Sequence, residues 1–199
     1  MPPMPDATVN KNLEGGGARA RVQRFGGYLA GMIMPNIGAF IAWGLITALF
    51  IPTGWLPNER LAVLVGPMIF FLLPILIGYT GGRMVHGQRG AVGGAVATMG
   101  VVVPAADGLL NPTAEDPTSV PMFLGAMLMG PLAAYVLKLV DNAIQDRVPS
   151  GFEMLIDNFS AGIVGALAAI GGVFAIGPIV SRLIEWLGNG VDALVTNNL

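Results

Sequence analysis

Long apolar stretches without charge dominate the pattern of hydrophobic and polar positions along this chain. Five windows contain no Asp, Glu, Lys or Arg, and they cover residues 25–58, 61–82, 90–106, 117–137 and 158–181. About 20 apolar residues in a helix cross a hydrocarbon core of about 30 Å. The pattern therefore predicts an all-α integral membrane protein with about five transmembrane helices, at residues 25–51, 61–82, 90–106, 117–137 and 158–181.

Two parts of this pattern need separate interpretation. The window at 90–106 holds only 17 residues, so it either crosses the membrane or is partly re-entrant. After Arg182, apolar residues recur at helical spacing, while Glu185 and Asp192 lie off that stripe. We therefore expect residues 183–199 to form an amphipathic helix that lies at the membrane interface or packs against the core.

The distribution of basic residues predicts the orientation. Eight of the 10 Lys and Arg residues fall in the N-terminal tail (1–24), in the second loop (83–89) or in the fourth loop (138–157). These segments lie on one side of the membrane if all five windows cross it, and only Arg60 and Arg182 lie on the opposite side. Because cytoplasmic loops carry the excess of Lys and Arg, the tail is expected to be cytoplasmic. The loop at 107–116 holds three acids and no base, which agrees with an outside location. The tail is not expected to be a signal peptide, since the apolar run after it exceeds the roughly 7 to 15 residues of an h-region.

Composition supports a bilayer protein and excludes several kinds of chemistry. Hydrophobic residues make up 54% of the chain and charged residues 11%, whereas a soluble domain carries about 25% charged residues. The absence of cysteine excludes disulfides, thiolate metal sites and cysteine nucleophiles. A net charge of -2 gives no reason to expect nucleic-acid binding. We predict no cofactor, no metal and no catalytic residue within this chain.

Small residues recur four positions apart where helices are expected to meet. The pairs are Gly27 with Gly31, Gly78 with Gly82, and Gly90 with Gly94. In lipid, such pairs let helix backbones approach closely enough for dispersion to hold them together. They indicate either close packing within the chain or the interface of a dimer.

Pro35 and Asn36 lie in the middle of the first predicted span. A proline there frees a carbonyl one turn back, and the neighbouring amide needs partners inside the protein. Asn36 therefore either lines a polar pathway or ties two helices together. Trp43 lies seven residues further on and so shares a helix face with Asn36.

The stretch 78–94 combines seven glycines with Arg83, His86 and Arg89. Glycine amides beside arginines could cradle a phosphate or a phosphorylated partner. The alternative is a tight cytoplasmic hairpin that carries arginines of the inner side. The stretch matches no nucleotide-binding motif. His86 is the only histidine, and we expect it to be a solvated loop residue.

Four carboxylates flank the fourth loop: Asp141, Asp146, Glu153 and Asp157. Paired acids can perform acid–base chemistry. At a membrane surface beside Lys138 and Arg147, however, a solvated polar face is the expected role.

Several long blocks carry a resemblance to a known family. They are MPNIGAFIAWGLITALFIPTGWLPNE (34–59), GPMIFFLLPILIGYTGGRMVHGQRGAVGGAVATMGVVV (66–103), PMFLGAMLMGPL (121–132) and GFEMLIDNFSAGIVG (151–165). In this order they resemble the membrane IIC domain of mannitol permeases of the bacterial phosphoenolpyruvate-dependent sugar phosphotransferase system. The resemblance implies a homodimer in the lipid of the bacterial inner membrane that takes up mannitol or a related hexitol. A IIB domain, charged by IIA and ultimately by the histidine phosphocarrier protein, would phosphorylate the sugar.

The chain also departs from this family. It resembles only the first, dimer-forming scaffold half of the IIC domain, without a GIHE-type motif or the IIB phosphocysteine. It could be a fragment, a truncated product or half of a split permease; the alternative is a self-contained scaffold, regulator or pore. Within the chain, we expect Asn36 and Trp43 to contact the sugar, and Arg83 and Arg89 to contact the phosphorylated partner or product phosphate. The isolated chain is expected to bind mannitol weakly or not at all and to phosphorylate none.

Overall fold

The computed structural model describes residues 18–106, 121–144, 148, 151–184, 186 and 188. Every regular element in these ranges is a helix, which confirms the all-α class. In chain order they are α1 (Ala18–Ile33), the 3-10 turn η1 (Met34–Asn36), α2 (Ile37–Phe50), α3 (Glu59–Ala62), α4 (Val65–Pro67), the π-helical η2 (Met68–Leu72), α5 (Leu73–Ala106), α6 (Phe123–Ile144), α7 (Glu153–Gly171) and the π-helical η4 (Gly172–Ile176). After η4 the chain stays helical to residue 184.

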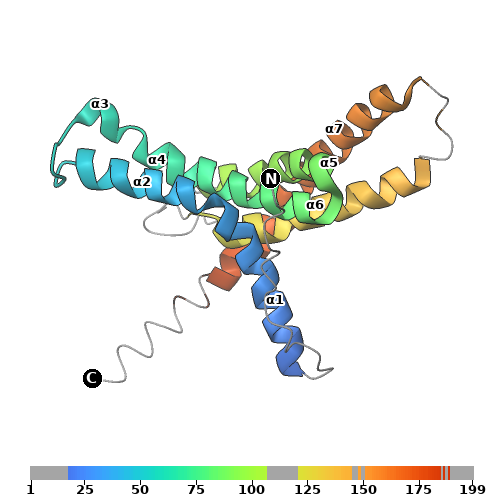
Figure 1. The fold of residues 1–199 in the computed structure, drawn as a ribbon, viewed down its shortest axis with the longest axis horizontal. Helices are drawn as coiled ribbons and strands as arrows, with labels where there is room; N and C mark the ends of the chain where they lie inside the picture. Colours follow the sequence, from blue (N-terminus) through green and yellow to red (C-terminus); the bar gives the residue numbers. More distant parts are fainter. Residues whose placement is uncertain are drawn as a thin grey trace, which may run out of the picture.

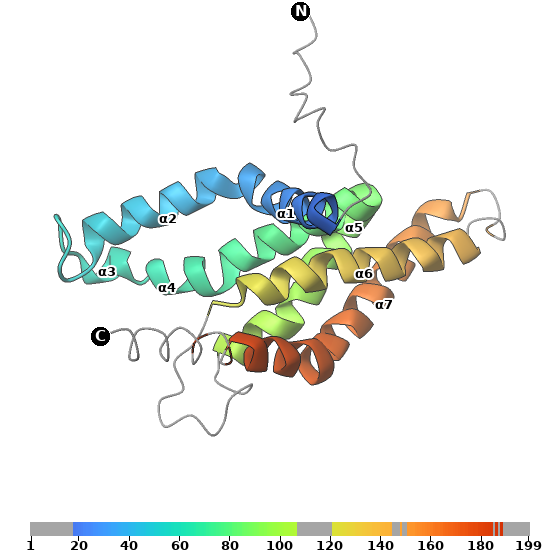
Figure 2. The same cartoon turned by 90° about the horizontal axis from the view of Figure 1, so that it is seen from below.

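A proline divides the first long helical segment. Pro35 lies in η1, between α1 and α2. Because proline lacks a backbone N–H and clashes with the preceding turn, an α-helix bends or breaks there. The helix α1 runs crosswise to α2: it lies across the long axis of the molecule in Figure 1 and is seen nearly end-on in Figure 2. The span predicted at residues 25–51 therefore contains a sharp change of direction.

The helix α5 folds back on itself at His86 and Gly87. His86 has φ −144° and ψ 40°, and Gly87 has φ 57° and ψ −147°, so neither is helical. Glycine adopts the left-handed region that this turn requires without steric cost. The first arm of α5 (residues 73–85) and the second arm (88–106) thus form an antiparallel hairpin (Figure 2). The hairpin predicted for the glycine-rich stretch is confirmed.

Glycines allow the two arms of α5 to touch along their backbones. A Cβ added to Gly82 would fall on the carbonyl oxygen of Gly90, and one added to Gly94 would lie 2.8 Å from the carbonyl oxygen of Gly78. Close packing within the chain is therefore confirmed for these two small-residue pairs. Gly27 differs, because no atom of the described residues lies within 4 Å of the place where its Cβ would stand.

The helices α6 and α7 pack against this hairpin. A Cβ on Gly130 of α6 would fall on the backbone of Gly78, and one on Gly100 would fall on the backbone of Ala169 in α7. Around these contacts lies the main buried core, which consists of Ala97, Val101, Val102, Ala105, Met122, Met129, Ala133 and Val180. A smaller cluster of Met32, Ile77 and Ala126 joins α1 to the bundle.

Four helical segments in the described part of the chain are long and apolar enough to cross a membrane. They are Ala20–Phe50, Glu59–Ala106, Phe123–Ile144 and Glu153–Ile184. The second has 48 residues and contains the α5 hairpin, so it includes both of the segments predicted at 61–82 and 90–106. The α7 helix begins at Glu153, five residues before the uncharged window, because an acidic side chain is favoured in the first turn of a helix.

Other predicted segments lie outside the described residues. The loop at 107–116 is one of them, as are the first 17 residues of the N-terminal tail. Most of the amphipathic helix predicted at 183–199 also lies outside, although the helix that follows η4 runs to residue 184.

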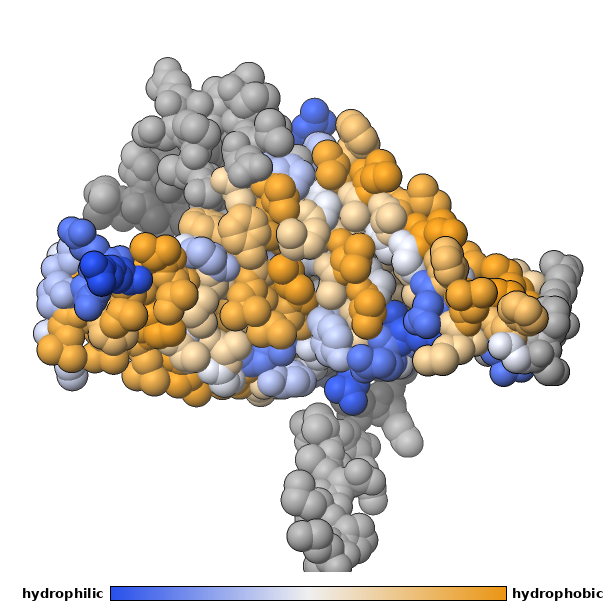
Figure 3. All heavy atoms as spheres, turned by 90° about the horizontal axis from the view of Figure 1, so that it is seen from above, coloured by the Kyte–Doolittle hydropathy of each residue, from blue (hydrophilic) through white to orange (hydrophobic). Residues whose placement is uncertain are grey.

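Large hydrophobic side chains cover much of the outer surface. Ile41, Leu45, Leu139, Leu167 and Ile170 are each more than half exposed. Figure 3 shows hydrophobic residues spread across the visible face, with hydrophilic residues gathered in a few places. Contiguous apolar surface of this extent is unfavourable in water and suits the hydrocarbon of a bilayer.

Candidate functional site

Asn36 ties the bend of the first segment to α5. Its Nδ2 donates to the carbonyl oxygen of Met32 at 2.9 Å, to that of Leu76 at 3.1 Å and to the hydroxyl of Thr80 at 2.9 Å. Thr80 in turn donates to Leu76 at 2.8 Å. Of the two alternatives for Asn36, the tie between helices is thus present. Its Oδ1 accepts no hydrogen bond from the described residues, and these residues do not fully enclose it.

Trp43 makes a similar connection one helical segment along. Its indole N–H donates to the carbonyl oxygen of Val65 in α4 at 3.2 Å. Asn36 and Trp43 both turn toward the neighbouring segment 65–80, as their spacing of seven residues predicts. Their expected role in sugar binding stays a prediction.

Arg89 joins three helices through its guanidinium group. Nη1 donates to Asp157 Oδ1 at 2.8 Å, and Nη2 donates to Asp141 Oδ1 at 2.9 Å and to Ser160 Oγ at 2.7 Å. Nη2 also lies 2.8 Å from the carbonyl oxygen of Asp157. These contacts link the second arm of α5 to α6 and α7 close to the turn of the hairpin. We call Arg89, Asp141, Asp157, Ser160 and His86 the inter-helix cluster.

The expectation that His86 is a solvated loop residue is wrong. Its Nε2 lies 2.6 Å from Asp141 Oδ2, and a quarter of its side chain is exposed. The reason is the non-helical conformation at His86 and Gly87, which turns the chain so that the imidazole faces α6. The hairpin is therefore fixed to α6 on both sides of its turn, by His86 and by Arg89.

A buried carboxylate lies at the centre of the inter-helix cluster. The side chain of Asp141 is 4% exposed, so the solvated face expected for it is also wrong. A buried charge is tolerated where it is paired and hydrogen-bonded, and Arg89 and His86 supply these partners. Asp157 is paired as well but is 44% exposed. Glu153 is exposed, and Asp146 lies outside the described residues.

The two arginines of the glycine-rich stretch have different surroundings. Arg83 is exposed and has no ion pair with any residue that the structure describes. Arg89 is bound by two carboxylates, and its side chain is 26% exposed. Both were expected to contact a phosphorylated group. The geometry leaves that role open for Arg83, whereas Arg89 would first have to release its partners.

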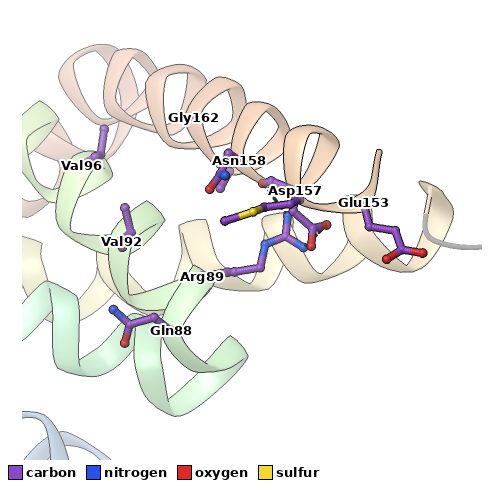
Figure 4. Close-up of a pocket in the computed structure, with 10 residues that line it drawn as sticks. Gln88, Arg89, Val92, Val96, Glu153, Asp157, Asn158 and Gly162 are labelled. Carbon is purple, nitrogen blue, oxygen red and sulfur yellow. Dashed lines mark hydrogen bonds and ion pairs between the residues drawn. The ribbon is translucent and has the colours of Figure 1, made fainter. Parts of the chain in front are cut away.

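A cleft of about 560 Å³ lies beside the inter-helix cluster, between the second arm of α5 and α7. Figure 4 shows Arg89 reaching from α5 toward Asp157 on α7, and Asn158 directed into the space beside Val92 and Val96. Polar and apolar side chains share its lining, which consists of Gln88, Arg89, Val92, Val96, Glu153, Met154, Asp157, Asn158, Ala161 and Gly162. The Nε atom of Arg89 is enclosed and has no hydrogen-bond partner among the residues that the structure describes.

Sequence reasoning missed Thr80 and Ser160 as members of these polar contacts. A hydroxyl residue in an apolar helix carries no signal of its own, because it can satisfy itself on the preceding turn, as Thr98 does with Gly94. Asp157 and Ser160 are three residues apart and so share a helix face. That spacing was the available sign that they act together.

Comparison with known proteins gives a consistent result. Residues 30–198 match the model of the family described as "Phosphotransferase system, EIIC". The chain is 57% identical over 183 residues to the "PTS system mannitol-specific EIICB component" of Geobacillus stearothermophilus, and 56% identical over 184 residues to the protein of that name in Bacillus subtilis (strain 168). It is also 56% identical over 182 residues to the "PTS system mannitol-specific EIICBA component" of Vibrio cholerae serotype O1.

The alignments cover most of this chain and a minor part of each relative. They include 92% of the chain in all three cases, but 36% of the Geobacillus and Bacillus proteins and 26% of the Vibrio protein. The chain thus spans about a third or less of the length of these curated relatives. No solved structure matches it.

Proposed function

The chain belongs to the phosphotransferase system EIIC family, and on that premise we propose that it is part of the membrane component of a mannitol transporter. The observation that carries this proposal is the 57% identity over 183 residues to a mannitol-specific EIICB component. The long apolar helices and the exposed hydrophobic surface support a location in the bacterial inner membrane. The excess of Lys and Arg in the N-terminal tail and the even-numbered loops supports a cytoplasmic N-terminus.

The proposed sugar contacts are Asn36 and Trp43. The Nδ2 group of Asn36 is used within the protein, while its Oδ1 remains as an acceptor for a sugar hydroxyl. The indole N–H of Trp43 is also used, which leaves the apolar ring faces for the C–H groups of a hexitol. Both side chains are half-buried at a junction of helices, where a small movement would change their exposure.

The proposed partners are a phosphorylated IIB domain and, upstream of it, IIA and the histidine phosphocarrier protein. Arg83 is the better candidate for contact with a phosphorylated group, since it is exposed and has no ion pair within the described residues. A guanidinium group without a competing carboxylate binds a phosphate through charge-assisted hydrogen bonds. Arg89, in contrast, holds the inter-helix cluster together.

We further propose that the chain forms a homodimer. Gly27 is exposed and has open space around it, so it can receive a small-residue face of a second copy. Gly31 is less free, because a Cβ there would lie 3.0 Å from the terminal methyl group of Met84.

Complementation in cells tests the transport function. The chain would be expressed in a bacterium that lacks its own mannitol permease, together with the part of the Bacillus subtilis relative that lies beyond the aligned region. Radiolabelled mannitol uptake is expected only when both parts are present. As a control, Gly100→Leu should abolish uptake, because the side chain would fall on the backbone of Ala169. If both parts are detected in the membrane of the same cells and no mannitol is taken up, the proposal is contradicted.

A binding measurement separates the contribution of this chain from that of the rest. Purified chain titrated with mannitol is expected to show weak binding or none, and to form no mannitol phosphate with phosphorylated IIB. If submicromolar binding is observed instead, the sugar site lies largely within this chain. Asn36→Ala should then abolish it, while Asn58→Ala, which removes only the cap of α3, should not.

A further inference from the structure

The cleft between the second arm of α5 and α7 combines features that a membrane lipid would recognise. Its lining includes the polar side chains of Gln88, Arg89, Glu153 and Asp157 and the apolar side chains of Val92, Val96 and Ala161. Val92 and Val96 are 49% and 43% exposed, so the apolar part of the lining is open to the surroundings of the helices. A ligand that fits this lining has a polar head and an apolar chain.

The charges of the cleft specify the head. Two carboxylates, Glu153 and Asp157, and one guanidinium, that of Arg89, line the cleft, and of the two carboxylates Asp157 is paired with Arg89. Asp141, which is paired with the same guanidinium, adds a further carboxylate behind Arg89. A head with net negative charge would be repelled by this excess of acid, whereas an ammonium group is attracted to it.

A hydrogen-bond donor in the cleft wall is also unused. The two terminal nitrogens of Arg89 are engaged by Asp141, Asp157 and Ser160, but the enclosed Nε–H has no acceptor within the described ranges. A buried donor without a partner is unfavourable, so an acceptor at this place would be stabilising. Met154 lines the same cleft, is 80% exposed and has a flexible side chain that can adapt to a ligand.

We propose that this cleft binds a zwitterionic phospholipid whose head carries a primary ammonium group, as in phosphatidylethanolamine. The ammonium group interacts with Glu153 and Asp157, a phosphate oxygen accepts from Arg89 Nε–H and the amide of Asn158, and an acyl chain lies along Val92, Val96 and Ala161. A trimethylated ammonium group has no N–H to donate to the carboxylates, so phosphatidylcholine binds more weakly. This inference does not depend on the transport role proposed above.

Lipid retention by the purified chain tests the proposal. Delipidated chain is incubated with equal amounts of phosphatidylethanolamine, phosphatidylcholine and phosphatidylglycerol of identical acyl chains, repurified, and analysed for bound lipid by mass spectrometry. At least fivefold more phosphatidylethanolamine than either other lipid is expected. Equal retention of the three lipids, or a preference for phosphatidylglycerol, would overturn the proposal, and equal retention is also the result expected if the cleft instead receives a protein segment.

Two variants locate the lipid. Gly162→Leu adds a large side chain to the lining of the cleft at a position where no described atom lies within 4 Å of the new Cβ, and it should remove the preference. Its matched control is Gly38→Leu on α2, which also enters open space and should keep it. Glu153→Gln, an exposed change that leaves the inter-helix cluster intact, should reduce the preference at least threefold. If Gly162→Leu and Gly38→Leu retain the same lipid, the cleft is not the site.

Discussion

The carboxylate of Asp141 lies 2.6 Å from Nε2 of His86, the residue at which α5 turns back on itself. The other oxygen of the same carboxylate lies 2.9 Å from Arg89, three residues after His86. A single buried side chain of α6 therefore holds both sides of the turn at Gly87. This arrangement gives the tip of the hairpin a defined conformation, although Gly87 alone would allow many.

Replacing Asp141 should destabilise the whole bundle. Asp141→Asn leaves the charge of Arg89 without its most buried partner, and removal of one member of a buried ion pair costs about 3–5 kcal/mol. Asp157 remains as a second partner of Arg89, so we expect about 3 kcal/mol. Thermal or denaturant unfolding in detergent measures this loss. Glu153→Gln, an exposed carboxylate, should change the stability by less than about 0.5 kcal/mol.

The general architecture could be predicted from the sequence because a bilayer imposes a simple requirement on it. Uncharged windows such as 61–82 follow from the cost of burying charge in hydrocarbon, and the hairpin follows from the glycines and arginines between two such windows. The proline at position 35 itself indicates a bend. The direction of the bend cannot be predicted from it, because the direction depends on the hydrogen bonds of Asn36 to Leu76 and Thr80.

The inter-helix cluster could not be derived in the same way. Arg89 is 52 residues away from Asp141 along the chain and 68 residues away from Asp157, so no local spacing connects it with either carboxylate. A surface location was the reasonable expectation for carboxylates at the end of an uncharged window. Only the packing of α5, α6 and α7 brings Asp141 into the interior, where an unpaired charge would be too costly.

Close backbone contacts should make some glycines irreplaceable. Gly100→Ala places a methyl group on the backbone of Ala169, and such overpacking costs about 1–3 kcal/mol or more. Gly38→Ala enters open space within α2 and should instead stabilise that helix by up to about 1 kcal/mol. Unfolding of the two variants under the same conditions makes the comparison. Equal stability of both would show that the contact at Gly100 is looser than described.

The orientation of the chain can be tested with reporter fusions. Fusions at Asn12, Gln88 and Gln145 are expected to report cytoplasm, and fusions at Asn58 and Asn111 periplasm. The physical basis is the excess of basic residues on one side together with the reversal of the chain at His86. A periplasmic signal at Gln88 would contradict the topology, because Gln88 follows the turn of the α5 hairpin directly.

The proposed homodimer gives a separate prediction. Gly27→Leu places a large side chain where the structure shows open space, so it should leave the fold of the monomer unchanged while separating two facing helices. Cross-linking in detergent should therefore yield less dimer for this variant than for the parent. The control is Gly66→Leu, which also enters open space, on α4. Equal dimer yields for Gly27→Leu and the parent would exclude this face of α1 as the interface.

Replacing the two arginines of the hairpin should have different effects on the stability of the bundle. Arg83→Gln removes an exposed charge with no ion pair in the described part of the chain, so the stability of the bundle should change by less than about 0.5 kcal/mol. Arg89→Gln breaks the contacts to Asp141, Asp157 and Ser160. It should therefore destabilise the bundle by about 3 kcal/mol or more.

Phosphate transfer from phosphorylated IIB to mannitol, measured in the complemented transporter, completes this comparison. If Arg83 contacts the phosphorylated group, Arg83→Gln should slow transfer about tenfold, which corresponds to the loss of one charge-assisted hydrogen bond of about 1.5 kcal/mol. Arg83→Lys retains the charge and should recover part of the rate, whereas Arg60→Gln, expected on the opposite side of the membrane, should have no effect. A normal rate for Arg83→Gln would show that the partner meets another surface. Because Arg83→Gln is expected to leave the bundle stable, a slow rate for it could not be explained by unfolding, and this is what makes Arg83 a sharper probe of partner contact than Arg89.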